Sequence, residues 1–94
     1  MKATAQPTVQ IDNARTRVTE WRFSPGAATG FHTHEFDYVI VPCTTGALKI
    51  IDAQGAETIA QLTAGTSYFR NAGVAHDVIN ANDHEFVFVE VEFK

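Results

Sequence analysis

Two of the four histidines in this 94-residue chain have a spacing that suits a metal ion. His32 and His34 are separated by one residue, so on an extended strand both imidazoles lie on the same face, with Cα atoms about 6 to 7 Å apart. Two ring nitrogens at that spacing can reach one ion at roughly 2.0–2.2 Å each. A third histidine from another strand, such as His76, would complete a site that suits Fe, Mn, Ni, Cu or Zn.

Other residues with reactive or polar side chains have alternative interpretations. His84 lies in the polar segment 82–85 and is expected to be exposed. Asn80 follows His76 by four residues on the same predicted face, so it either lines a cavity or satisfies backbone groups at the end of a strand. Cys43 has no adjacent base, and we interpret it as a small buried hydrophobic residue rather than a nucleophile.

The elements that must position these side chains are predicted to be strands. Valine, isoleucine, threonine and aromatic residues are abundant, whereas straight-chain helix formers are scarce. Turn residues recur about every six to twelve positions, as in a sandwich or small barrel. We therefore expect one all-β domain over residues 1–94. The predicted strands cover residues 8–12, 15–23, 29–34, 36–41, 47–51, 57–62, 67–70, 76–81 and 85–93.

Charge and hydropathy exclude several classes of partner. The formal net charge is −4 and the seven Lys and Arg residues are scattered, which argues against nucleic-acid binding. No apolar stretch approaches the roughly 20 residues that span a bilayer, so no membrane association is expected. The first ten residues lack the apolar segment of a secretory signal. A single cysteine allows no internal disulfide, and we expect a cytoplasmic protein.

The residues around the histidine pair resemble the first motif of the cupins. That motif is a Gly, five residues, His-x-His, three or four residues, a Glu, six residues and a Gly. Here Gly26, His32 and His34 match its opening without a gap, and Gly46 can serve as the closing glycine.

A second cupin motif follows in the expected order. Gly65 opens it, Gly73, His76 and Asn80 match its later positions, and only the proline is missing, because Asn71 takes its place. The resemblance covers about residues 20–94. It implies a single-domain cupin, which is a double-stranded β-helix that forms a conical antiparallel β-barrel or jelly roll. It also implies one divalent metal ion inside the barrel, with His32, His34 and His76 as ligands.

One departure from the pattern leaves the fourth metal ligand open. The glutamate of the first motif would fall at position 38 or 39, where this chain has Tyr38 and Val39. Asp37 could reach inward if the chain bulges after His34, and we take it as the candidate fourth ligand. Glu35 points the other way in regular strand geometry. The alternatives are a three-histidine site completed by water, or no stable metal site.

The resemblance leaves two functions open, because the cupin fold serves many activities. The first is a divalent-metal-dependent enzyme, either dioxygenase-like or using Lewis-acid chemistry, that acts on a small organic compound in the barrel. The catalytic residues are not assigned. The alternative is a non-catalytic cupin that binds or senses a small molecule or a metal.

Small cupins commonly pair, so the resemblance also implies a homodimer. The segment 86–93, with sequence FVFVEVEF, should be either a central strand or a strand covered by a partner chain. Residues 1–7 should form a loose arm or an arm that contacts the partner.

Overall fold

The protein folds into two antiparallel β-sheets, as the sequence predicted. The structure is a computed structural model that describes residues 3–94. In this part of the chain, no helix is long and apolar enough to cross a membrane. The strands are β1 (Gln6–Asp12), β2 (Thr16–Phe23), β3 (His32–Thr33), β4 (Asp37–Pro42), β5 (Gly46–Asp52), β6 (Glu57–Leu62), β7 (Tyr68–Arg70), β8 (Ala75–Asn80) and β9 (Phe86–Phe93).

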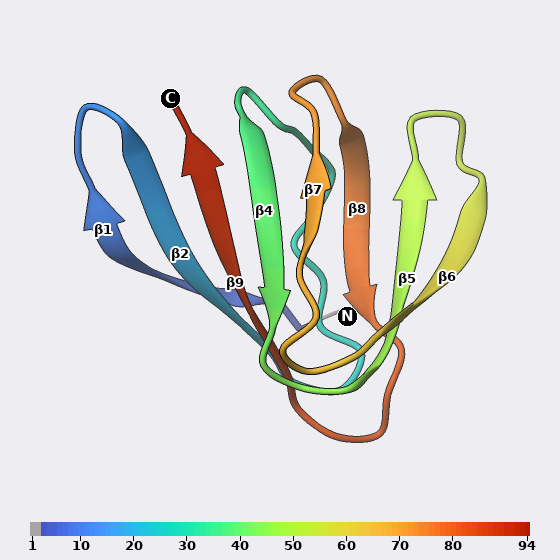
Figure 1. Ribbon diagram of the computed structural model, residues 1–94. Coiled ribbons are helices and arrows are strands. Elements are labelled where there is room, and N and C mark those ends of the chain that lie inside the picture. The colour runs from blue at the N-terminus through green and yellow to red at the C-terminus, as the bar shows by residue number, and fades with distance from the viewer. Residues whose placement is uncertain (1–2) are drawn as a thin grey trace.

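The two sheets form the walls of a conical barrel. The five-stranded sheet has the order β1-β2-β9-β4-β7, and the four-stranded sheet has the order β3-β8-β5-β6. The strands converge at the lower end of Figure 1 and spread apart at the upper end. Because β8 starts at the wide end and β9 finishes there, the first residues of β8 and the last residues of β9 lie at the barrel mouth (Figure 1).

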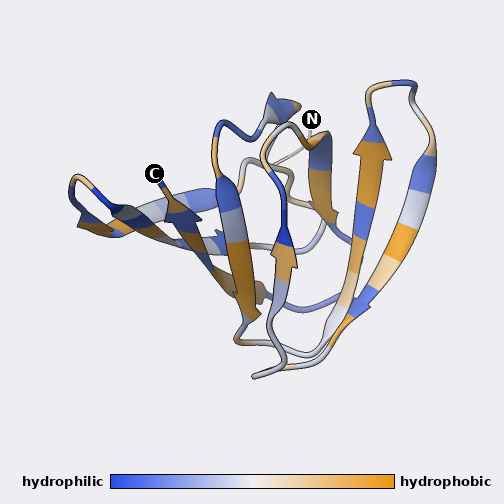
Figure 2. Ribbon diagram, turned by 45° about the horizontal axis from the view of Figure 1, so that its top comes forward, coloured by the Kyte–Doolittle hydropathy of each residue, from blue (hydrophilic) through white to orange (hydrophobic). Residues whose placement is uncertain are grey.

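Alternation along the strands builds the core between the sheets. In β9, Phe86 and Phe88 are buried whereas Val87 and Val89 on the other face are only partly buried. Hydrophobic and hydrophilic residues accordingly succeed one another along the strands in Figure 2. Burying one such phenylalanine stabilises the fold by about 1.5–3 kcal/mol. Strand β9 lies between β2 and β4, so of the two alternatives for this segment the structure shows a central strand.

The N-terminal segment is more ordered than we expected. The backbone N–H of Ala5 donates to the carbonyl of Ala28 at 2.9 Å, and the N–H of Ala28 donates to the carbonyl of Ala3 at 2.9 Å. Ala5 is 2% exposed, so residues 3–7 are not a loose arm. Residues 1–2 of that predicted arm lie outside the described residues. Contact of this segment with a partner stays a prediction.

The side chain of Asn80 forms hydrogen bonds with backbone groups at the narrow end of the barrel. Its side chain is buried, and Nδ2 donates to the carbonyls of Phe23 at 3.2 Å, Ser24 at 3.2 Å and His84 at 2.9 Å. Its Oδ1 accepts the backbone N–H of Asn82 at 2.9 Å. Of its two interpretations, the structure therefore supports backbone satisfaction at a strand end.

Candidate metal centre

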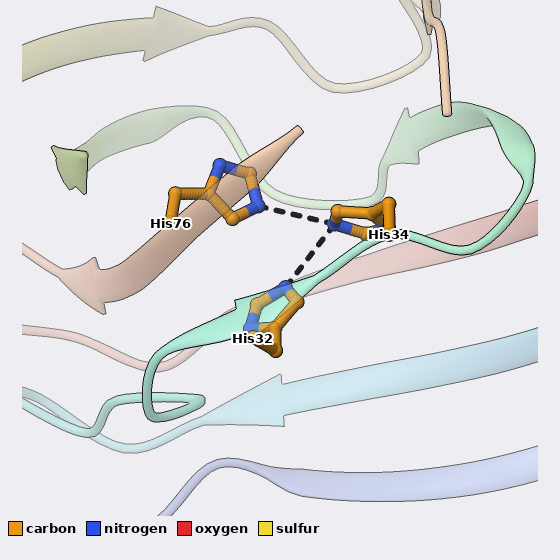
Figure 3. Close-up of side chains that lie close together, drawn as sticks. All are labelled: His32, His34 and His76. Atoms are coloured by element: carbon orange, nitrogen blue, oxygen red, sulfur yellow. Dashed lines mark hydrogen bonds between the residues drawn. The ribbon is translucent and has the colours of Figure 1, made fainter. Parts of the chain in front are cut away.

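Three histidines converge at the wide end of the barrel. His32 on β3 is the register partner of His76 on β8, and His34 follows directly after β3. Nε2 of His34 lies 3.1 Å from Nε2 of His32 and 3.1 Å from Nε2 of His76 (Figure 3). The candidate ligand atoms of all three residues lie within 4.8 Å of one another. The structure thus brings together the three histidines that the two motifs indicated.

A glycine turn holds His34 in this position, although β3 has already ended. The N–H of His34 donates to the carbonyl of Val74 at 2.8 Å, and the N–H of Gly73 donates to the carbonyl of His34 at 2.8 Å. Gly73 has φ +96°, a conformation that residues with a side chain rarely adopt. The motif glycine therefore connects the backbone of one histidine to the strand that carries another.

The ring contacts cannot all be hydrogen bonds. His32 Nδ1 lies 2.9 Å from the carbonyl oxygen of Gly30, which can only accept, so the proton of a neutral His32 is on Nδ1 and Nε2 is bare. His34 Nε2 faces two neighbouring nitrogens and carries at most one proton. If that proton points to His32, His34 Nε2 has neither a lone pair nor a second proton for its contact with His76. If His34 Nε2 is bare, neither it nor the bare Nε2 of His32 supplies a proton for the contact between them. A cation between the three rings would remove this conflict.

The spacing of the nitrogens fits a metal ion. Two imidazole nitrogens at roughly 2.0–2.1 Å from one ion and at right angles to each other are about 3 Å apart. Both measured Nε2–Nε2 distances are 3.1 Å. Three neutral nitrogen donors that leave further coordination positions open suit Fe, Mn, Ni, Cu or Zn, and the donor set does not choose among them.

Burial keeps two of these rings neutral. Together with the positive charge that His32 can carry, it lowers the pKa of His34 and of His76 to about 4. Metal binding requires the neutral ring, so these two ligands need lose no proton at pH 7. Tyr38 stacks on His34 with ring centroids 3.9 Å apart, which fixes the plane of the ring.

Two carboxylates on β9, which the sequence analysis missed, lie next to the histidines. Glu90 is 8% exposed, and its Oε2 lies 3.6 Å from His34 Nδ1. Burial, together with the charge of Glu92, raises the pKa of Glu90 to about 7, and the hydrogen bond from Trp21 opposes this rise. Glu92 accepts from Arg17 Nε at 2.7 Å and from Arg17 Nη2 at 3.0 Å, which is a two-pronged ion pair.

A signal for these carboxylates is present in the sequence. Within FVFVEVEF, Glu90 and Glu92 are in phase with Phe86 and Phe88, so one face carries two phenylalanines followed by two glutamates. If the phenylalanines point into the barrel, so must the glutamates. The alternation of this strand therefore carries the signal for both carboxylates.

The candidate fourth ligands do not join the histidines. Asp37 is exposed, and its Oδ1 accepts the N–H of Ala72 at 2.7 Å, so its carboxylate caps a turn. Glu35 is exposed, and neither acid belongs to the metal-binding group that the described residues form. Tyr38, at one of the two positions where the motif glutamate would fall, stacks on His34 instead. The geometry therefore gives no support to Asp37 as a ligand.

Two further residues can be compared with their predictions. His84 is exposed, as expected from its polar surroundings. Cys43 is also exposed, so the prediction that it is buried was wrong. It follows Pro42, the buried last residue of β4, in a segment that turns away from the core.

The histidines and β9 carboxylates open into one cavity of about 410 Å³. A volume in this range accommodates a small molecule. Aromatic and aliphatic side chains form much of its wall, together with the histidines, Arg17 and the two glutamates of β9. The site therefore combines a cluster of nitrogen donors with a cavity large enough for a small organic ligand.

Comparison with known proteins places this architecture. No family model matches the sequence. A cupin domain from Bordetella pertussis Tohama I is 56% identical, superposes with a TM-score of 0.96, and the match covers 100% of this chain and 97% of that chain. A cupin 2 conserved barrel domain protein from Salinispora arenicola, 21% identical, has the same fold with a TM-score of 0.72, over 96% of this chain and 76% of that chain.

The chain belongs to the cupin superfamily. It is also similar to a curated relative, the beta-alanine degradation protein BauB of Pseudomonas aeruginosa. The two are 59% identical over 90 residues, which cover 96% of this chain and 94% of the relative.

Proposed function

We propose that this cupin is a divalent-metal-dependent enzyme that acts on a small organic acid in its barrel. The observation that carries the proposal is the convergence of three Nε2 atoms, two pairs of them 3.1 Å apart, in the wall of a cavity of about 410 Å³. The name of the BauB relative supports a small substrate connected with β-alanine breakdown.

The residues of the chain have separate tasks in this proposal. His32, His34 and His76 would hold the ion, which would polarise a substrate oxygen as a Lewis acid or, as Fe(II), support dioxygenase-like chemistry. The carbonyl of Gly30 fixes the tautomer of His32, and the ring of Tyr38 fixes the plane of His34. The apolar wall excludes water from the reacting end of the substrate.

Elemental analysis of protein made without an affinity tag tests the metal. We expect about one divalent ion per chain, which dialysis against a chelator removes and added metal restores. A protein that neither contains a metal nor binds one on titration would contradict the proposal.

Activity is tested separately on the loaded protein. β-Alanine and related three-carbon acids are incubated with the Fe(II)- and Zn(II)-loaded forms, while products are followed by mass spectrometry and O₂ by an electrode. Conversion that stops after chelation supports an enzyme. Full metal content with no conversion of any such acid would favour the alternative, a non-catalytic metal- or small-molecule-binding cupin.

We propose in addition that the chain forms a homodimer through β1. All seven residues of this edge strand are exposed, including Val9 at 55% and Ile11 at 50%, and only one edge of β1 is paired. Long apolar edges are usually covered, and two-fold pairing of identical chains is the commonest way to do so. Light scattering should give 20.6 kDa, twice the 10.3 kDa of one chain. A mass of one chain at micromolar concentration would contradict the dimer.

A further inference from the structure

A buried carboxylate without a cationic partner lies in the cavity beside the three histidines. Glu90 is 8% exposed and forms no ion pair with a Lys or Arg of residues 3–94. Its oxygens have two polar neighbours, Trp21 Nε1 at 3.4 Å and His34 Nδ1 at 3.6 Å. Both contacts are long, and a carboxylate offers about four acceptor positions. Glu90 therefore has unused acceptor capacity toward the cavity.

The arginine that lines this cavity is already paired with another carboxylate. Arg17 lines the same cavity, but its Nε and Nη2 both donate to Glu92. The cavity wall thus holds two buried carboxylates and one guanidinium, and the ion pair cancels one of the two negative charges. Buried charges in proteins are normally paired, so Glu90 lacks a partner that a ligand can supply.

The surroundings of Glu90 favour a positively charged group. The cavity wall contains the aromatic rings of Trp21, Tyr38, Tyr68 and Phe88. The faces of aromatic rings attract cations within about 6 Å, and they also pack against the apolar parts of a small molecule. A primary ammonium, with three N–H donors, matches both the open acceptor positions and the rings.

We propose that the cavity binds a short amino acid with its amine and carboxylate at opposite ends, the carboxylate facing the histidines and the ammonium bound by Glu90. The inference rests on the proposed function, because the metal that the three histidines would hold would anchor the carboxylate. The inference goes beyond that function by assigning the carboxylate end of the substrate to the histidines and the ammonium end to Glu90. A ligand that has lost its amine is accordingly bound more weakly, so the site separates an amino acid from its deaminated products.

Calorimetry with β-alanine and propionate tests the inference, since these probes differ only in the amine. The full chain is loaded with one equivalent of Zn(II), and unbound zinc is removed. Wild-type protein should bind β-alanine at least tenfold more tightly than propionate. Glu90→Gln should weaken β-alanine binding roughly 10- to 100-fold, the range for hydrogen bonds to charged groups, and leave propionate binding within about twofold.

Matched variants keep the test decisive. Glu57→Gln removes an exposed carboxylate that does not line this cavity and should keep the preference for β-alanine. Glu90→Asp retains the charge and should retain part of the preference, which gives a readout if Glu90→Gln does not fold. Equal binding of the two probes by wild-type protein would overturn the inference, and so would a Glu90→Gln variant that weakens both probes equally.

Failure of this inference is distinguishable from failure of the proposed function. Zinc content is measured before any probe is added. A chain that does not retain zinc contradicts the metal-dependent function itself. A chain that retains zinc and binds both probes alike contradicts only the assignment of Glu90 to the amine.

Discussion

The two sheets supply opposite kinds of polar group to the cavity. The four-stranded sheet contributes His32 and His76, whose ring nitrogens can donate an electron pair to a cation. The five-stranded sheet contributes Glu90, buried and without an Arg or Lys partner among residues 3–94, and the ion pair of Glu92 with Arg17. His34 lies between them, with Nε2 toward the other histidines and Nδ1 toward Glu90. One side of the cavity is thus suited to a metal and the other to a positively charged group.

The difference shows how burial shifts the pKa of histidine and of glutamate in opposite directions. Burial disfavours the charged form, so it lowers the pKa of His34 and His76 to about 4 and raises the pKa of Glu90 to about 7. Neutral histidines gain a function from this shift. In the absence of a ligand, an ionised Glu90 lowers the stability of the folded state, as expected of a binding site rather than of a structural ion pair.

Removing one histidine should have the largest effect. His76→Ala should lower zinc affinity by more than roughly 100-fold, because even residues that only support a ligand change affinity about 10- to 100-fold. Competition with a chromogenic chelator measures the affinity. His84→Ala, which removes an exposed histidine outside the group, should bind zinc as the wild type does. Full zinc affinity in His76→Ala would disprove the three-histidine site.

The histidine side of this comparison could be predicted from the sequence, but the carboxylate side could not be predicted in the same way. Spacing within the motifs fixed His32, His34 and His76 because each motif carries its own turn glycine, such as Gly73 with φ +96°. The alternation within FVFVEVEF points Glu90 into the barrel, but its place beside the histidines follows from sheet pairing, since β9 lies beside β4 with Glu90 opposite Ile40. That pairing joins residues 50 positions apart, which local patterns do not show.

Most strand assignments were accurate for a related reason, although the predicted strand 29–34 is reduced to β3 (His32–Thr33). Alternation and turn residues are local, so the predicted segment 57–62 coincides with β6 (Glu57–Leu62). The shift of Asp37 from predicted ligand to turn cap depends instead on the N–H of Ala72, which belongs to a distant turn. Sequence thus indicated the fold and the nitrogen donors, whereas contacts between distant strands decided the acidic groups.

Replacing Glu90 should stabilise the metal-free protein at high pH. The folded-state pKa of about 7 exceeds the ordinary value of 4.5, so the folded state binds the proton more tightly and stability falls as pH rises from 4.5 past 7. Glu90→Gln removes this penalty and should raise the free energy of unfolding by about 3 kcal/mol at pH 8. Urea unfolding of metal-free protein measures it. At pH 4.5 the gain should vanish, and an equal gain at both pH values would refute the buried ionisation.

The turn that joins the two histidine segments should have a smaller effect. Gly73→Ala forces a side chain into φ +96° and should cost about 1–2 kcal/mol of stability. Because Gly73 donates its N–H to the carbonyl of His34, zinc affinity should fall severalfold as well. Gly55→Ala, in the β5–β6 turn with φ +81°, should lose similar stability without changing zinc affinity. If both variants bind zinc equally well, the turn does not position His34.

The smallest effect should come from Asp37, although its place next to the motif made it the candidate ligand. Its carboxylate is exposed and accepts the N–H of Ala72 at 2.7 Å, on the outside of the metal-binding group. Asp37→Asn keeps an oxygen for that hydrogen bond and removes only a solvent-screened charge, which is worth little at a distance. Zinc affinity should therefore change by less than about twofold between pH 6 and 8. A loss of tenfold or more in the chelator competition would mean that Asp37 swings inward on metal binding, and the fourth ligand would then come from the chain rather than from water.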